Sequence, residues 1–239
     1  MSGSWYHSIV VLDVEASGTM PDSEKKKVSD DLYALVRAAL EGSGIPADAV
    51  RWEDRGDGIF LLISSAVAES LLVDPFVDLI DSALAARPVG EPLLRLRVVI
   101  HHGEVIVGER TASGRAVDTA FVLLDSPELR ESLKAARGGR LALAVGDDLY
   151  LSLIRGNDRP NPDAFRRRRL KTKYGDMPVW VTVTGVHEQP GSSRRTPDEP
   201  LSESSAPAMY VAQRDSYHVQ GGQHGSVGGN FHGAGHGGD

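Results

Sequence analysis

The chain has 239 residues, a formal net charge of −7 and no cysteine, which excludes disulfides and thiolate metal sites. The negative charge argues against a general nucleic-acid-binding protein, and no apolar run approaches the roughly 20 residues that span a bilayer. The N-terminal segment lacks the basic start and the small-residue cleavage site of a signal peptide. We therefore expect a cytoplasmic protein that binds neither membrane nor nucleic acid.

Composition changes sharply near Gly185, and this change divides the chain into three parts. Residues 1–186 contain closely spaced apolar segments and predict one globular domain. Residues 187–208 are rich in Pro, Ser and charge, which predicts a flexible linker with little to bury. Residues 209–239 are rich in Gly, His and Gln, and predict a disordered low-complexity tail.

The first predicted elements are a strand, a helix and a pair of strands. The apolar run Ser8–Val14 predicts a central strand. Apolar residues at helical spacing then predict a helix between Asp22, which can cap its start, and Gly42, which can end it. The segments AVRWED and GIFLLI predict two strands joined tightly through Arg55-Gly56-Asp57.

The rest of the domain continues in the same manner. The pattern predicts helices over about 66–86 and from about 116, and strands over 94–100, 104–108, 141–145 and 178–185. The arginine run 166–169 is interpreted as a solvated basic loop or as a rim that attracts polyphosphate. The order β-α-β-β-α-β predicts an α+β fold: a split-βαβ (ferredoxin-like or palm) sheet, rich in antiparallel strands, with helices on one face.

Polar residues interrupt the apolar runs at strand ends. Asp13 ends the first strand, and a carboxylate there suggests a site because burying an unpaired charge is costly. Asp57 lies between two glycines, which suits a turn as well as a metal ligand at the edge of a sheet. Arg97 fits either a solvated or salt-bridged surface residue or a phosphate contact. His101 and His102 are interpreted as residues that pack a turn.

Together these motifs resemble the class III nucleotidyl cyclase domains. That family carries an Asp at the end of the first strand, a second Asp in a GD hairpin, an R-x-x-I-H-x-G-x-V-x-x-G segment and a G-x-x-V-N-x-A helix start. The matching segments, in the same order over nearly all of residues 8–185, are VVLDVEASG with Asp13, RGDGIF with Asp57, LRVVIHHGEVIVG with Arg97, GRAVDTA with Gly114, and RLKTKYGDMPVWVTV with Lys171.

The resemblance implies that the ribose 3′-hydroxyl of a nucleoside triphosphate attacks the α-phosphate and expels pyrophosphate. Asp13 and Asp57 would hold two Mg²⁺ or Mn²⁺ ions, which prefer carboxylate and phosphate oxygens. The Val14–Gly18 backbone, with Gly18 at its end, would hold phosphate through N–H groups. Lys171, or else Lys173, would neutralise the leaving pyrophosphate. Class III sites form between two subunits, so a homodimer is expected if the domain is active.

The sequence departs from the family at the positions that stabilise the reacting phosphate. Asp118 and Val122 stand where active members place an Asn and an Arg, and losing that Arg should cost orders of magnitude in rate. Asp118 would still bind the nucleotide through a hydrogen bond to the ribose, although its charge is unfavourable near a triphosphate. The positions that read the base are Glu53 and Thr111, and a glutamate at the first resembles the guanine-selecting pattern. This leaves two hypotheses: a cyclase with a weak preference for GTP, or a catalytically degenerate signalling module that binds a nucleotide or only a protein partner.

The tail contains a second resemblance. Val219, Gln220 and Gly222 match the V-Q-x-G core of amyloid-forming interaction motifs used in necroptotic and bacterial immune signalling. In that interpretation the tail would recruit an effector protein with a similar motif. The alternatives are a flexible Gly-rich tail and metal binding by four histidines whose irregular spacing fits no compact metal motif.

Overall fold

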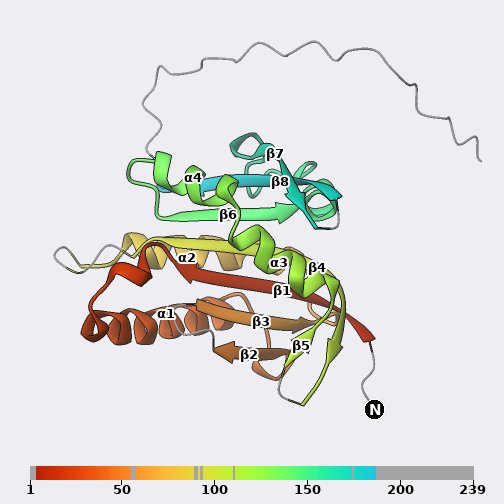
Figure 1. The fold of residues 1–239 in the computed structure, drawn as a ribbon, viewed down its shortest axis with the longest axis horizontal. Coiled ribbons are helices and arrows are strands. Elements are labelled where there is room, and N and C mark those ends of the chain that lie inside the picture. Colours follow the sequence, from red (N-terminus) through yellow and green to blue (C-terminus); the bar gives the residue numbers. More distant parts are fainter. Residues whose placement is uncertain are drawn as a thin grey trace, which may run out of the picture. The chain divides into compact units, whose positions relative to one another are not determined.

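The computed structural model describes residues 4–54, 58–88, 91, 94–109, 111–173 and 175–186. Asp57 lies outside these residues, as do the predicted linker 187–208 and the tail 209–239 with Val219, Gln220 and Gly222. Within the described ranges the strands form one eight-stranded sheet in the order β2-β3-β1-β4-β6-β8-β7, with β5 paired to β4 (Figure 1). Among the described strand pairs only β4 and β6 run parallel, so the expected α+β fold with an antiparallel-rich sheet is confirmed.

The strands are β1 (Ser4–Val14), β2 (Val50–Asp54), β3 (Gly58–Ser64), β4 (Leu96–Val107), β5 (Ala112–Ser113), β6 (Leu141–Gly146), β7 (Arg166–Thr172) and β8 (Gly175–Thr184). The main helices are α1 (Asp22–Gly42), α2 (Val77–Ala85), α3 (Arg115–Leu124) and α4 (Pro127–Ala135), and the short ones are α5 (Asp147–Leu149), η1 (Ser17–Thr19), η2 (Ala47–Ala49), η3 (Leu72–Phe76), η4 (Tyr150–Ile154) and η5 (Pro162–Ala164). None of the helices in the described ranges combines the length and apolar character that a bilayer crossing requires.

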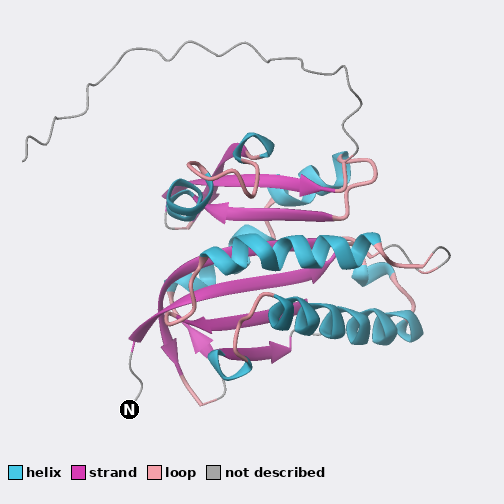
Figure 2. Cartoon of the chain, turned by 180° about the vertical axis from the view of Figure 1, so that it is seen from behind, coloured by secondary structure: helices cyan, strands magenta, loops and turns pink. Residues whose placement is uncertain are grey.

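The sheet is buried on both faces because successive side chains of its central strands point to opposite sides. Val10 and Leu12 of β1 belong to the hydrophobic core under α1 and α2, whereas Ile9 and Val11 belong to the core under α3 and α4. Figure 1 shows α3 and α4 in front of the sheet, and Figure 2 shows the helices behind it. The expectation of helices on one face therefore holds for α1 and α2 only, since α3 and α4 cover the other.

The predicted strand pair around His102-Gly103 is one continuous strand, β4. Antiparallel pairing with β1 runs without interruption from Val14, opposite Leu96, to Ser4, opposite Ile106. Gly103 does not form a turn; it allows α3 to pack closely against β4. Its φ is +152°, and a Cβ built there would lie 2.8 Å from the Cβ of Ala116, which begins the buried face of α3.

Two further predicted elements differ from the structure. The helix predicted over 66–86 is divided, because Asp74 takes an extended conformation (φ −160°, ψ 120°) immediately before Pro75. The arginine run interpreted as a loop forms most of strand β7, which pairs with β8 from Arg166 opposite Val181 to Thr172 opposite Gly175. The arginine run lacks the alternation of apolar and polar residues that predicts a strand. It forms one because its backbone hydrogen-bonds to the more apolar strand β8.

Candidate functional site

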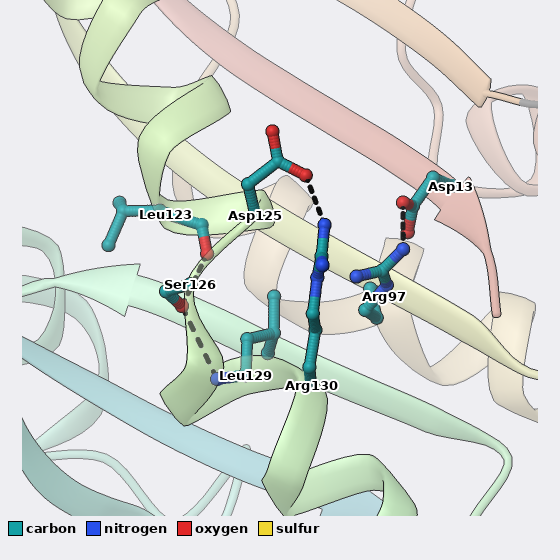
Figure 3. Close-up of polar contacts among 7 residues, drawn as sticks. All are labelled: Asp13, Arg97, Leu123, Asp125, Ser126, Leu129 and Arg130. Atoms are coloured by element: carbon teal, nitrogen blue, oxygen red, sulfur yellow. Dashed lines mark hydrogen bonds and ion pairs between the residues drawn. The ribbon is translucent and has the colours of Figure 1, made fainter. Parts of the chain in front are cut away.

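The carboxyl end of β1 carries the first predicted site residue. Asp13 lies opposite Gly58 of β3 and Arg97 of β4. The Nη2 of Arg97 donates to Oδ2 of Asp13, as Figure 3 shows. The side chain of Arg97 is only 11% exposed and that of Asp13 15%, so water screens this ion pair much less than one at the surface. The structure thus brings Asp13 and Arg97 together and excludes a solvated Arg97.

A cavity of about 740 Å³ opens beside this pair. The predicted phosphate loop forms one wall, from Glu15 to Gly18, and turns sharply through Ala16, which has a left-handed φ of 61°. Glu15 is anchored to β4 through Arg95, whose Nη1 lies 2.8 Å from its Oε2. No atom lies within 4 Å of a Cβ built on Gly18, so that position faces open space. The volume falls in the range of about 300–1,000 Å³ that is typical of small-ligand sites.

Two basic residues of α4 also line the cavity, and sequence reasoning missed both. Arg130 and Lys134 lie one helical turn apart, but Asp125 and Glu131 line the cavity with them, and Arg130 is paired with Asp125 at 2.6 Å (Figure 3). Ser126 fixes the start of α4: its Oγ accepts from the N–H of Leu129 at 3.3 Å and donates to the carbonyl of Leu123 at 2.7 Å (Figure 3). The sequence Ser126-Pro127 is a typical helix start, and this signal could have predicted the helix that carries Arg130 and Lys134.

The residues predicted to act on the ribose and on the leaving pyrophosphate lie where α3 meets the β7–β8 hairpin. The Nζ of Lys173 lies 2.9 Å from Oδ2 of Asp118, and both side chains are at least 48% exposed. The side chain of Val122 packs against the core under α3 and α4, so an apolar contact occupies the position of the missing arginine. Lys171 is exposed on β7 opposite Asp176. Of the two lysines, Lys173 is therefore the one paired with Asp118.

The predicted base-reading residue also has a clear environment. Oε1 of Glu53 accepts from the backbone N–H of Ala112 at 2.9 Å, next to Thr111, and lies 3.6 Å from Nη2 of Arg51. Arg51 in turn donates to the carbonyl of Gly108 at 2.7 Å. Strand β2 thereby holds the segment that carries Thr111. The structure places Glu53 against the backbone of Ala112, the residue after Thr111, and the role of Glu53 and Thr111 in reading a base stays a prediction.

The adjacent histidines are not turn residues, because they lie within β4 and point to opposite faces. Nδ1 of His102 lies 3.0 Å from Oε1 of Glu69, which also accepts from Oγ of Ser8 at 3.2 Å. His101 is largely buried on the α3 side. Burial lowers the pKa of His101 to about 4, repulsion from His102 adds to this effect, and Asp148 opposes it.

The described residues meet only part of the requirement for a metal site. They contain no group of three or more His, Cys, Asp or Glu side chains able to hold an ion. Asp13 offers one carboxylate, the ligand type that Mg²⁺ prefers, next to Arg97, which lines the cavity. The second predicted ligand, Asp57, follows the end of β2 and lies outside the described ranges. The described residues therefore supply one suitable carboxylate but not a complete set of ligands.

Comparison with solved structures identifies the fold. The chain is similar to the guanylyl cyclase Cya2 (TM-score 0.55, 18% identity, covering 80% of this chain and 97% of that one). It is similar to an adenylate/guanylate cyclase/hydrolase from Silicibacter pomeroyi (TM-score 0.54, 18% identity, covering 77% of this chain and 99% of that one). It is also similar to a bacterial light-regulated adenylyl cyclase (TM-score 0.53, 16% identity, covering 78% of this chain and 54% of that one). No family profile and no curated protein matches the chain. The described domain has the fold of class III adenylyl and guanylyl cyclases.

Proposed function

We propose that the domain binds a nucleoside triphosphate, preferentially GTP, and converts it slowly to a cyclic nucleotide and pyrophosphate. The observation that carries this proposal is the Asp13–Arg97 pair, whose Arg97 lines the 740 Å³ cavity together with the Glu15–Gly18 loop. In the cyclase fold this combination offers a carboxylate for metal, a planar guanidinium for phosphate oxygens and a turn that admits the phosphate chain. Arg130 and Lys134 also line the cavity, but Asp125 and Glu131 accompany them and Arg130 is paired with Asp125 at 2.6 Å, so nucleotide binding would require that pair to open.

Each residue then has a defined task. Asp13, with Asp57, would hold two divalent ions, whose bound form supplies charge neutralisation and activation of the ribose hydroxyl. Arg97 would exchange its partner Asp13 for a phosphate oxygen when nucleotide binds. Glu53 would accept hydrogen bonds from the guanine edge. Lys171 or Lys173 would neutralise the pyrophosphate, and a homodimer would join this half of the site to its complement.

A second function, nucleotide binding without turnover, is favoured by one specific observation. Lys173 is paired with Asp118 at 2.9 Å, and Val122 replaces the arginine that should stabilise the reacting phosphate. A negatively charged Asp118 repels a triphosphate and withholds Lys173 from it. The domain would then report nucleotide occupancy to a partner.

One experiment separates the two functions. The purified chain is incubated with each nucleoside triphosphate and Mg²⁺ or Mn²⁺, and products are identified by liquid chromatography and mass spectrometry. Asp13→Ala and Asp57→Ala are run in parallel with Asp48→Ala, which changes an exposed carboxylate of η2. A cyclic product that both site variants lose and the control keeps establishes the cyclase. Calorimetric binding without product establishes the binding module, and absence of both refutes the nucleotide site.

For the tail we propose recruitment of an effector through Val219, Gln220 and Gly222, on the strength of the V-Q-x-G motif alone. A synthetic 209–239 peptide should form thioflavin-positive fibrils, and substitution of Val219 and Gln220 by alanine should abolish them. A wild-type peptide that stays monomeric at high concentration, with and without seeds, contradicts this role.

A further inference from the structure

Strand β7 is an open edge of the sheet. It is the last strand in the order, and among the described strands β8 is its one neighbour (Figure 1). An edge strand presents a row of backbone N–H and C=O groups that another extended chain can pair with. The seven residues of β7 are enough for a partner strand of ordinary length.

The same edge carries an unusual concentration of positive charge. Four consecutive arginines, Arg166–Arg169, are exposed, while Leu170 is buried in the core under α3 and α4. Because strand side chains alternate, Arg166 and Arg168 share the face of Leu170, and Arg167 and Arg169 share the other. Residues two apart on one face are separated by about 6.6 Å. The edge therefore offers a cationic ladder on each side, within a chain of net charge −7.

The carboxylates of the described residues do not neutralise this ladder. Arg167 and Arg169 are 61% and 80% exposed, and their nearest ion-pair distances, to Asp147 and Asp176, are both 3.8 Å. Exposed pairs at such distances contribute little. Positive charge on an edge strand also discourages aggregation, but single lysines commonly suffice for that purpose. Four adjacent arginines, which repel one another, instead suit a partner that brings several negative charges.

The structure favours an acidic peptide over a nucleic acid as that partner. The unpaired backbone edge is useful only to another polypeptide. Among the described residues, two aromatic side chains beside β7 are not available for stacking on bases, because Trp180 stacks on Tyr150 at 3.6 Å and Phe165 is buried. A side-by-side acidic strand would satisfy the backbone of β7 and place its carboxylates against the arginines of the same face.

We propose that the β7 edge binds an extended, acidic peptide segment of a partner protein by strand addition, with Arg167 and Arg169 pairing with alternate carboxylates. This site is independent of the proposed nucleotide chemistry. It nevertheless adjoins that chemistry, because Lys171 belongs to β7 and Lys173 follows it in the hairpin that contacts Asp118.

The test uses the full chain and three probes of equal charge. These are a capped peptide of about eight residues that alternates Glu and Thr, the same peptide N-methylated at three consecutive central residues, and a short oligothymidylate. Binding is followed by fluorescence anisotropy for the wild type and for Arg167→Gln/Arg169→Gln. The matched control is Arg137→Gln/Arg155→Gln, which removes two exposed arginines elsewhere. Circular dichroism and thermal unfolding verify that both variants remain folded.

We expect the unmodified peptide to bind, and the β7 double variant to weaken it about tenfold or more while the control stays within about twofold. N-methylation should abolish binding because it removes backbone donors and blocks close strand approach. Equal binding of the methylated peptide or stronger binding of the oligothymidylate would overturn the proposal in favour of a charge-only polyanion surface. Absence of binding to any probe, or equal losses in the two variants, would also overturn it.

Discussion

The ammonium group of Lys173 lies 2.9 Å from the carboxylate of Asp118, so a lysine expected to act on pyrophosphate is held by a residue that stands where active cyclases place an asparagine. We predict that Asp118→Asn combined with Val122→Arg raises cyclase turnover at least tenfold. The substitution releases Lys173 and restores a cation that stabilises transition-state charge, an effect typically worth about 10²–10³ in rate. Product formation per enzyme at saturating nucleotide measures it.

The control for this gain is Asp158→Asn with Leu151→Arg, which makes the same changes of charge at two exposed positions. It should leave turnover unchanged. A double variant at 118 and 122 that folds, binds nucleotide and shows no gain would indicate that these two positions are not what limits the reaction.

The Asp13–Arg97 pair should be coupled in stability as well as in binding. Arg97→Gln leaves the carboxylate of Asp13 in a largely buried place without its cation, and we expect a loss of about 2–4 kcal/mol in the free energy of unfolding. Asp13→Asn with Arg97→Gln should be less damaging than the sum of the single changes. Urea unfolding of all four proteins gives the coupling energy, expected at about 1–3 kcal/mol; additive losses would mean that the two side chains do not interact.

Gly103 is expected to be intolerant of any side chain. A Cβ at this position would lie 2.8 Å from Ala116 of α3, and its φ of +152° is strained for other residues. Gly103→Ala should lower the free energy of unfolding by about 1–3 kcal/mol, whereas Gly156→Ala, with open space around the new Cβ, should be nearly neutral. Equal effects would remove the packing explanation for this motif glycine.

The sequence was informative where chemistry and local pattern coincide. The end of β1 at Asp13–Val14 and the start of α1 at Asp22 follow directly from apolar periodicity. The predicted cap by Asp22 is wrong, because Pro21 is the N-cap residue of α1 and no side chain caps the helix start. The partners of Asp13 could not be read in this way, because its contact with Arg97 depends on the register of strands 84 residues apart. The pairing of Asp118 with Lys173 could not be predicted either, because it joins residues 55 positions apart in the sequence.

Pattern reasoning failed where tertiary contacts override local composition. Arg166–Arg169 has no apolar alternation, yet it forms a strand because β8 supplies the ladder. His102-Gly103 resembles a turn, yet β1 pairs across it and keeps β4 continuous. In both cases the neighbouring strand, and not the segment itself, determines the structure.

Burial of His101 should make the folded domain sensitive to acid. The pKa of this imidazole is lowered from 6.5 to about 4, so between these values the unfolded chain binds a proton that the folded chain does not. Stability from this group is therefore complete above pH 6.5, falls as the pH decreases towards 4, and levels off below that value. The separation corresponds to a loss of about 2–3 kcal/mol across this window.

His101→Gln removes the titrating group, so the slope of unfolding free energy between pH 6.5 and about 4 should flatten for this variant. His7→Gln, which removes a histidine near the start of β1 but leaves His101 in place, should keep the wild-type slope. The measurement is urea unfolding at intervals of half a pH unit, with the three proteins compared at each pH. If His101→Gln and the wild type lose stability in parallel, other groups cause the acid sensitivity, and the environment of His101 does not disfavour its charged form.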